Sequence, residues 1–417
     1  MFNNKVRFLR RLVSSILCAG LLFIPISSIY AEGETQGESY EEYSDPTPTP
    51  DPHTAAYYLS ADTDFISGWP FGPNIEAEAA VLMDVHTGSV LYSKNAEAAF
   101  YPASITKIMT ALLGCENLDP AATLAVSQAS AYGIEAGSSS IYADTGEEFT
   151  VDQALMAVML ESANEMSLAI GEETCGSVKK FVELMNERAR QLGCTNTHFN
   201  NPNGLPDEIH YTSAHDMARI AQAAYLNPRF RRLVTTQYYE IPPTNVMQET
   251  RYMRNHHQMM SGRDYAYDGV VGGKTGYTTV AGSTLVTFAE KGNTTLVAVV
   301  LKTIGGGYSD TAALLDYGFN QFEKNSVAKA GNSTSYKALP GEKYLLKDLA
   351  HASPFYYIQD AYVTVPKGTD INGLTKERTL LPAAAGPARL YTQYYYNGHP
   401  VGYSEQYEKE ILSDLLL

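Results

Sequence analysis

The sequence is poor in cysteine, with four among 417 residues. Cys18 lies in an apolar stretch near the N-terminus, which leaves Cys115, Cys175 and Cys194 for the rest of the chain. An odd number excludes complete pairing within one chain. Cys175 and Cys194 flank a predicted helix of about 15 residues, whose ends lie ~22 Å apart, too far for a direct bridge. A bridge from Cys115 to either stays open, but we expect free thiols.

Positive charge is scarce as well. The 30 lysines and arginines are outnumbered by 46 acidic residues, which gives a net charge of −16. Residues 1–31 hold four basic residues and no acid, so the remainder of the chain carries −20. Such a chain repels the phosphates of nucleic acids and of anionic lipids. We therefore expect no nucleic-acid partner and at most a peripheral or N-terminal association with a membrane.

Two families of catalytic motif are missing. The sequence has no His-Glu-x-x-His and no Glu-x-x-His, which argues against a catalytic zinc site. It also has no Gly-x-Ser-x-Gly, which removes a lipase-type nucleophile. His210 and His215 are close in the sequence, and without such a motif we expect them to be structural or surface residues. We expect neither a metal nor a cofactor.

Long apolar runs are confined to the N-terminus, where four basic residues precede the run 12–29 and Ala31 offers a small residue for cleavage. This pattern predicts a secretory signal over residues 1–31, either removed or kept as an anchor, and hence a protein at the outer face of the cell envelope or secreted. Residues 32–64 hold nine acids and no lysine or arginine. We expect residues 32–75 to be an acidic, proline-containing, disordered spacer.

The body of the chain, residues 76–325, combines strand and helix signals. Two strands and a tight turn are followed by a run of helices, then by further strands around 267–302 and a last helix at 309–322. This order favours an α/β fold in which an antiparallel sheet is flanked by helices. After residue 326, alternating Tyr, Thr and Val and the Asn397-Gly398 turn signal predict a small β domain over residues 326–417.

The spacing Ser-x-x-Lys occurs at Ser104/Lys107, Ser177/Lys180 and 326/329. Only the first pair opens an apolar helix, within "YPASITKIMTALLG". A lysine surrounded by apolar residues is poorly hydrated, which favours its neutral form and makes it a base. A spacing of three places both side chains on one helix face. The alternative, a lysine that reaches out to solvent, stays open for this pair taken alone.

Two further motifs follow in order: Ser162-Ala163-Asn164, between two predicted helices, and Lys274-Thr275-Gly276, on a predicted strand. Taken singly, each has an ordinary structural explanation, as a helix cap or a strand end. In this order and spacing, the triple resembles the signature of penicillin-binding proteins and serine β-lactamases. The flanking "GSSSIYADTGEEFTVDQALMAVMLESANEMSLAI", "NPNGLP" and "GGKTGYTTVAGSTLV" are similar to the serine D-alanyl-D-alanine carboxypeptidases, over about residues 76–325.

The resemblance implies a role for each residue. Ser104 would attack the carbonyl between two terminal D-alanines, Lys107 would take its proton, and Ser162 would relay a proton to the leaving amine. Asn164 would bind the substrate backbone and steady Lys107. Lys274 and Thr275 would hold the substrate carboxylate, and Gly276 would leave room for a peptide added to the sheet edge. The backbone N–H groups of Ser104 and Tyr277 would form the oxyanion hole.

The implied partners are peptidoglycan stem peptides ending in D-Ala-D-Ala, with β-lactam antibiotics as covalent inhibitors. Three other functions remain open. A class A β-lactamase needs a Glu-x-x-Leu-Asn segment, but the one Leu-Asn pair is Leu226-Asn227 and position 223 is alanine. An endopeptidase of wall cross-links shares the fold and motifs. A non-catalytic wall-binding module would keep the pocket without turnover.

Overall fold

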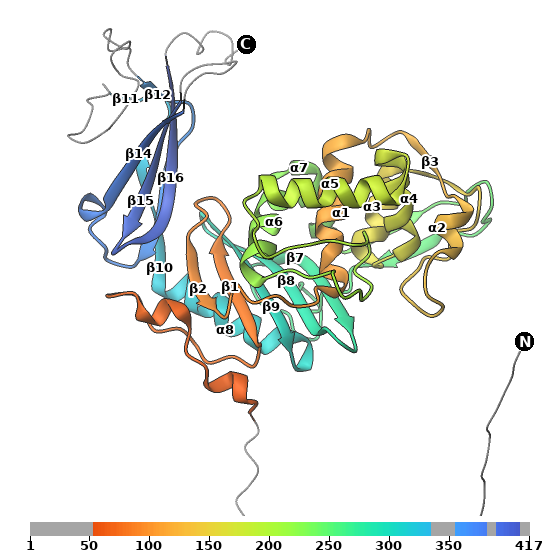
Figure 1. Cartoon of the computed structure of the whole chain (residues 1–417), viewed down its shortest axis with the longest axis horizontal. Helices are drawn as coiled ribbons and strands as arrows, with labels where there is room; N and C mark the ends of the chain where they lie inside the picture. Colours follow the sequence, from red (N-terminus) through yellow and green to blue (C-terminus); the bar gives the residue numbers. More distant parts are fainter. Residues whose placement is uncertain (1–52, 335–354, 382–388, 409–417) are drawn as a thin grey trace, which may run out of the picture. The chain divides into compact units, whose positions relative to one another are not determined.

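The central sheet is antiparallel and has the strand order β2-β1-β9-β8-β7. The structure is a computed structural model that describes residues 53–334, 355–381 and 389–408 (Figure 1). The β8–β9 hairpin turns at Gly292-Asn293, and β7 lies at the edge of the sheet. The strands are β1 (Ala79–Asp84), β2 (Val90–Lys94), β7 (Val270–Thr278), β8 (Gly282–Lys291) and β9 (Thr294–Thr303).

Helices cover both faces of this sheet, as the predicted fold class requires (Figure 1). Alternate residues of β1 point into two different cores: Val81 packs with the large helical layer, and Leu82 packs with α8. The helices are α1 (Lys107–Asn117), α2 (Gln128–Tyr132), α3 (Val151–Leu160), α4 (Asn164–Cys175), α5 (Val178–Gln191), α6 (Ala214–Leu226), α7 (Pro228–Thr235) and α8 (Tyr308–Gln321). Two small antiparallel sheets of two strands each lie beside the helical layer: β3 (Thr123–Ala125) with β4 (Glu148–Thr150), and β5 (Tyr238–Ile241) with β6 (Arg251–Arg254).

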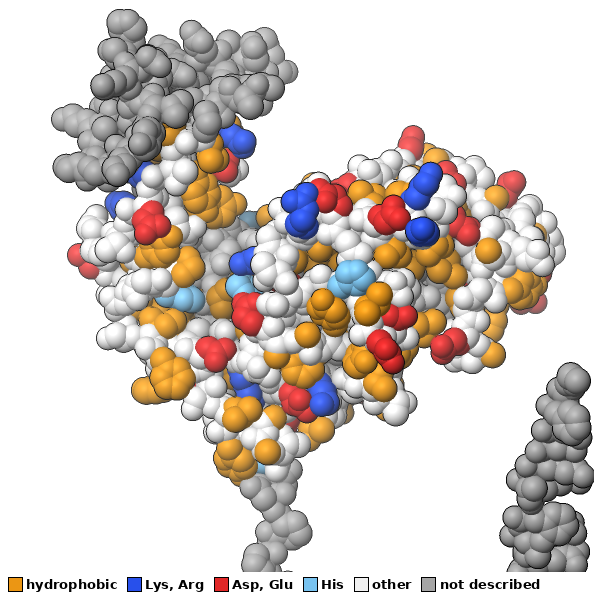
Figure 2. Space-filling view, viewed as in Figure 1, with side chains coloured by type: hydrophobic (Ala, Val, Ile, Leu, Met, Phe, Trp, Pro, Cys, Tyr) orange, Lys and Arg blue, Asp and Glu red, His pale blue; other side chains and the backbone are white. Residues whose placement is uncertain are grey.

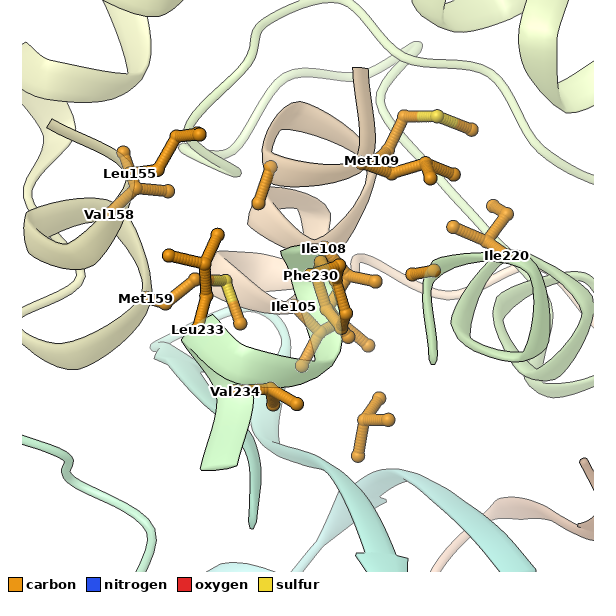
Figure 3. Packing of buried hydrophobic residues seen from close by; sticks show 14 of the residues in the cluster. Ile105, Ile108, Met109, Leu155, Val158, Met159, Ile220, Phe230, Leu233 and Val234 are labelled. Carbon is orange, nitrogen blue, oxygen red and sulfur yellow. The ribbon is translucent and has the colours of Figure 1, made fainter. Parts of the chain in front are cut away.

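Helix α1 lies in the middle of the helical layer and is apolar on all sides. Its residues from Lys107 to Cys115 are all buried. Figure 3 shows Ile105, Ile108 and Met109 pointing toward side chains of α3, α6 and α7. A helix that is apolar all round belongs in a protein interior. The residues at its N-terminal end are therefore held firmly.

The spacer expected over residues 32–75 is contradicted in its second half. Residues 55–58 and 62–65 form short 3-10 helices, and Ala61, Trp69 and Ile75 are buried. The buried Lys94 side chain of β2 donates to the carbonyls of Ala56 (2.7 Å) and Ile75 (2.8 Å). Because the sequence analysis averaged the composition over the whole segment, it overlooked these apolar residues, which anchor residues 53–75 to the folded body. The predicted signal and residues 32–52 lie outside the described residues.

The strands after α8 form the predicted β region. β10 (Phe322–Ala328) pairs with β13 (Ala361–Pro366), and a second sheet has the order β11-β12-β16-β15-β14. Its strands are β11 (Ser333–Thr334), β12 (Phe355–Tyr357), β14 (Thr375–Leu381), β15 (Arg389–Tyr396) and β16 (His399–Glu408), and Asn397-Gly398 forms the turn of the last hairpin.

A buried polar contact joins this β region to the central sheet. The sequence analysis had expected the two to be separate domains. The Thr364 hydroxyl of β13 donates to Asp84 (3.0 Å), and the Ser89 hydroxyl donates to the Thr364 carbonyl (3.0 Å). β10 begins at Phe322, before the boundary expected at residue 326, and the described residues from 53 onward belong to one compact unit by their contacts.

Cys115, Cys175 and Cys194 are all free, as expected. Burial raises the pKa of the Cys115 thiol to about 12 and that of Cys194 also to about 12, so both thiols are protonated and unreactive at neutral pH.

Figure 2 shows acidic and basic side chains interspersed over the viewed face. Within the described parts of the chain, no helix combines the length and the apolar character needed to cross a bilayer.

Candidate active site

Ser104 lies in a 3-10 turn, Ala103–Thr106, that leads directly into α1. Ala103 has a φ of 52°, a left-handed conformation that is strained for a residue with a side chain. Two glycines make room for this turn. A Cβ on Gly204 would lie 1.9 Å from the Ala103 carbonyl oxygen, and one on Gly276 would lie 2.9 Å from the Ser104 backbone nitrogen. The chain is thus shaped to hold Ser104 in one position.

Lys107 is fully buried, and its side-chain nitrogen has three oxygen neighbours. Nζ donates to the Ser104 hydroxyl (3.2 Å), to the side-chain oxygen of Asn164 (2.7 Å) and to the Asn203 carbonyl (2.6 Å). The alternative of a lysine reaching solvent is therefore wrong for Lys107. The predicted Ser104–Lys107 and Lys107–Asn164 pairs are both formed.

Burial lowers the pKa of Lys107 well below its usual range. The nearby Lys274 ammonium lowers it further, and the Glu165 carboxylate acts in the opposite direction. All three oxygen neighbours of Lys107 are neutral groups, so no direct ion pair holds its charge. A neutral amine within hydrogen-bond distance of a serine hydroxyl is suited to accept its proton.

Ser162 and Asn164 occupy the sharp turn between α3 and α4. Ser162 has a φ of 59°, and its hydroxyl is buried with no hydrogen-bond partner among the described residues. The backbone N–H of Asn164 donates to the Ser139 carbonyl (2.9 Å). The next side chain, Glu165, accepts from the Ser140 hydroxyl and the Ile141 N–H, both at 2.7 Å. The loop 139–141 therefore holds the turn while leaving the Ser162 hydroxyl unengaged.

Lys274 and Thr275 lie on the edge strand β7. Lys274 is 2% exposed, and its Nζ donates to the Thr275 carbonyl (3.0 Å). Burial lowers the pKa of Lys274 to about 7, and Glu161 opposes that shift. Glu161 itself accepts from the Arg254 N–H (2.6 Å) and contacts His256 (3.1 Å). A buried cation without a direct carboxylate partner is suited to receive an anionic ligand.

Gly276 and Tyr277 follow on the same strand. A Cβ at Gly276 would also meet the Thr284 hydroxyl at 2.4 Å, so the glycine allows β7 to approach the Ser104 turn. This is a packing reason that the sequence analysis did not find, since it assigned the glycine to peptide addition at the edge. The Tyr277 side chain is 70% exposed.

The match to a family covers more than half of the chain. Residues 69–304 fit the model of the D-alanyl-D-alanine carboxypeptidase family, Peptidase_S11. The chain belongs to this family. It is 34% identical over 306 residues to D-alanyl-D-alanine carboxypeptidase DacF of Bacillus subtilis, covering 72% of this chain and 76% of that protein. Identity to DacA of Escherichia coli K12 is 31% over 312 residues, covering 72% and 73%.

Solved structures agree with the family assignment. Penicillin-binding protein 5 of Haemophilus influenzae superposes with a TM-score of 0.65 at 26% identity, covering 82% of this chain and 98% of that one. A variant of the Streptomyces K15 DD-transpeptidase gives a TM-score of 0.56 at 30% identity, covering 60% and 99%. The predicted penicillin-binding protein fold is confirmed.

The other Ser-x-x-Lys pairs of this D-alanyl-D-alanine carboxypeptidase family member are structural. The Ser177 hydroxyl caps α5 by accepting from the Lys180 N–H (3.3 Å). Lys329, of the third pair, forms an ion pair with Asp360 (2.9 Å). The Leu226-Asn227 pair considered for a β-lactamase also has a structural role, because the Asn227 side chain caps α7.

The two histidines expected to be structural or surface residues differ in burial. His210 is buried, and burial lowers its pKa to about 4, so the ring is neutral. Its Nδ1 accepts from the Asn200 N–H (2.9 Å), and Nε2 contacts the Thr106 hydroxyl (2.9 Å). His215 contacts Glu97 (2.5 Å) near the surface. Among the described residues, no group of three or more His, Cys, Asp or Glu could hold a metal ion.

Two supporting residues of the carboxypeptidase site were missed by the sequence analysis. Asn203 provides a carbonyl to Lys107, and it lies in the quoted "NPNGLP" segment, to which no role was given. His257 lies beneath β7, where its Nε2 contacts the Thr287 hydroxyl (2.8 Å) and a Cβ on Gly273 would meet its ring. Burial, and secondarily Lys274, lowers the pKa of His257 to about 3. A neutral His257 adds no charge beside Lys274.

Proposed function

We propose that Ser104 is the nucleophile with which this protein removes the terminal D-alanine from peptidoglycan pentapeptides. The observation that carries the proposal is the contact between the fully buried Lys107 and the Ser104 hydroxyl, at 3.2 Å. Family membership supports the activity, because the relatives are named D-alanyl-D-alanine carboxypeptidases. An endopeptidase, a β-lactamase and a non-catalytic module are not favoured by these comparisons.

Acylation follows from the geometry of the two side chains. Neutral Lys107 accepts the hydroxyl proton as the Ser104 oxygen attacks the carbonyl carbon of the penultimate D-alanine. The negative charge on the carbonyl oxygen meets the backbone N–H of Ser104 and that of Tyr277. Collapse breaks the peptide bond and leaves an ester on Ser104.

The leaving amine needs a proton, and we assign its relay to Ser162. Its buried hydroxyl has no partner among the described residues and so is available to donate to the amine and to accept from protonated Lys107. Water then attacks the ester, with Lys107 again taking a proton, and the shortened peptide leaves. No step requires a metal or a cofactor.

Substrate recognition rests on the second lysine. Lys274 in its protonated form, together with the Thr275 hydroxyl, binds the terminal carboxylate, while Asn164 binds the peptide backbone. An approaching carboxylate favours the charged form of Lys274, so binding the substrate restores the proton that burial disfavours. The partner is thus a peptide ending in D-Ala-D-Ala, with a β-lactam as its covalent mimic, and the protein acts outside the cytoplasm.

The test is a comparison of wild-type protein with Ser104→Ala. Wild type is expected to release D-alanine from a pentapeptide and to gain the mass of one penicillin on the peptide that contains Ser104. The variant should do neither. D-alanine release by Ser104→Ala at the wild-type rate would refute the assignment of the nucleophile. Rapid penicillin turnover would instead make the protein a β-lactamase, and preferential cleavage of cross-linked muropeptides would make it an endopeptidase.

A further inference from the structure

A cavity of about 370 Å³ opens beside the active site. Its walls come from the residues just before Ser104, from the turn between β7 and β8, from β9 and from the segment 208–211. The lining is aromatic and aliphatic, with one carboxylate and one ammonium, and consists of Ala99, Phe100, Tyr101, Glu208, Tyr211, Val280, Ala281 and Lys302. None of these residues has a role in the chemistry described above.

The walls of this cavity are tied to the catalytic elements. Phe100 and Thr212 exchange two backbone hydrogen bonds, at 2.8 and 2.9 Å, which join the segment before Ser104 to the segment that carries Glu208 and Tyr211. The Thr284 hydroxyl of β8 donates to the Pro102 carbonyl (2.8 Å). The cavity therefore has a fixed position relative to Ser104 and β7.

The direction of the substrate follows from the proposed function, on which this inference rests. If Lys274 and Thr275 hold the terminal carboxylate and Tyr277 faces the scissile carbonyl, the peptide runs antiparallel along the edge strand β7. An extended chain advances about 3.3 Å per residue. The residue before the two D-alanines then lies beyond Tyr277, level with residues 278–280, where the cavity opens.

The backbone around Lys302 is distorted at this point. Ser283 pairs with Thr303 while Leu285 pairs with Val300, so β9 bulges, and Lys302 has a φ of 51°. A bulge re-aims a side chain, and a left-handed non-glycine residue is a strain that persists where the surroundings impose it. The re-aimed Lys302 forms an ion pair with Glu78 (3.0 Å).

The charges at the cavity favour a cation as ligand. Lys302 is engaged by Glu78, whereas Glu208 is exposed and forms no ion pair with any residue that the structure describes. The carboxylate that remains available is that of Glu208, and the aromatic walls suit an aliphatic stem.

We propose that this cavity is a specificity subsite that receives the side chain of the third residue from the substrate's carboxyl end. It selects a side chain with an aliphatic stem and a terminal ammonium, and Glu208 binds that ammonium.

The experiment measures D-alanine release from three α-acetylated tripeptides X-D-Ala-D-Ala, where X is lysine, Nε-acetyl-lysine or norleucine. Wild type is expected to show a kcat/KM about fivefold higher for the lysine peptide, as for a partly exposed ion pair. The preference should shrink at high salt. Glu208→Gln should remove the preference without slowing the acetyl-lysine peptide, and Glu208→Lys should reverse it.

Glu173→Gln, which changes an exposed carboxylate outside the cavity lining, is the matched control and should keep the preference. Equal rates for the three peptides with wild type, or an unchanged preference in Glu208→Gln, would overturn the subsite. Penicillin acylation of Ser104 tests the nucleophile independently of the subsite, since it does not need a third peptide residue. If no peptide loses D-alanine and penicillin does not acylate Ser104, the proposed function itself fails.

Discussion

Two regions of this protein bury a lysine, and they do so with opposite neighbours. Lys94 of β2 is 1% exposed and donates to two backbone carbonyls, and the nearby carboxylates of Asp310 and Glu76 favour its charged form. Lys107 of α1 is fully buried beside a hydroxyl, and its charged form is disfavoured by the ammonium of Lys274 and favoured by one carboxylate, that of Glu165. Burial lowers the pKa of both lysines.

The comparison teaches that burial alone does not make a lysine a base. At Lys94 the ammonium ties residues 53–75 to the central sheet, which is a structural task that needs the charge and both carbonyls. At Lys107 the amine lies near a second cation, Lys274, and beside a proton donor, the Ser104 hydroxyl. Its task is chemical and needs the neutral form of the lysine.

The largest expected effect is that of Lys107→Met, which keeps the length of the side chain and removes the amine. We expect kcat for D-alanine release to fall by about a thousandfold or more, because Ser104 loses its base. The variant also leaves the Asn164 side-chain oxygen and the Asn203 carbonyl without this donor, at a cost of about 1–3 kcal/mol each, so circular dichroism is used to check that it is folded. If Lys107→Met kept the wild-type kcat, Lys107 would not be the base and would not differ in role from Lys94.

The pH dependence sharpens the comparison further. Lys107 must be neutral and Lys274 charged, so kcat/KM should rise with pH through the lowered pKa of Lys107 and fall as Lys274 loses its proton, near pH 7. At pH 9 we expect roughly a hundredfold loss from the plateau. In Lys274→Arg the guanidinium stays charged, so the alkaline fall should disappear. If kcat/KM of this variant fell in the same way at alkaline pH, the fall could not be due to deprotonation of Lys274.

Lys94→Met should act on stability instead of chemistry. It leaves the Ala56 and Ile75 carbonyls without their donor, at a cost of about 1–3 kcal/mol each. Urea unfolding should therefore show a loss of about 2–6 kcal/mol, with kcat unchanged at low temperature. A loss of kcat comparable to that of Lys107→Met, without a loss of stability, would place Lys94 in the active site and end the distinction.

The smallest effect is expected at Ser177, the first residue of the second Ser-x-x-Lys. Ser177→Ala removes the cap of α5 and should cost about 1 kcal/mol in unfolding free energy, with no change in D-alanine release. The measurement is a denaturant titration paired with an activity assay. A large loss of activity would show that the motif spacing has a meaning that its place on α5 does not reveal.

Much of the fold could be predicted because local signals and packing agree. The capping box at Thr150 starts α3 as expected, and the turn signals at Asn293 and Asn397 lie in the β8–β9 and β15–β16 hairpins. α7, which the sequence analysis did not predict, is short and begins at Pro228 after an asparagine cap. The order of residues 53–75 could not be read locally, because it depends on Lys94 and on partners far along the chain.

The motif residues of the candidate site were predicted, whereas the residues that support them were missed. Ser104, Lys107 and Asn164 were found by motif, and the structure brings them within hydrogen-bond distance. The roles of Asn203 and Gly204 depend on a carbonyl and on a missing Cβ, which motif spacing does not encode. The strained φ of Ala103 likewise follows from tertiary packing.

The chain has one tryptophan, Trp69, and its position has a spectroscopic consequence. The indole N–H donates to the Leu91 carbonyl (2.9 Å), and the ring lies against Phe322 (5.0 Å between centroids) and His399 (4.7 Å). Fluorescence emission excited at the indole band therefore comes from the place where the N-terminal segment, the catalytic region and the C-terminal strands meet. A red shift of this emission on heating would report the temperature at which these three parts separate. Labelling of Ser104 by a labelled β-lactam would report the temperature at which the catalytic pocket is lost.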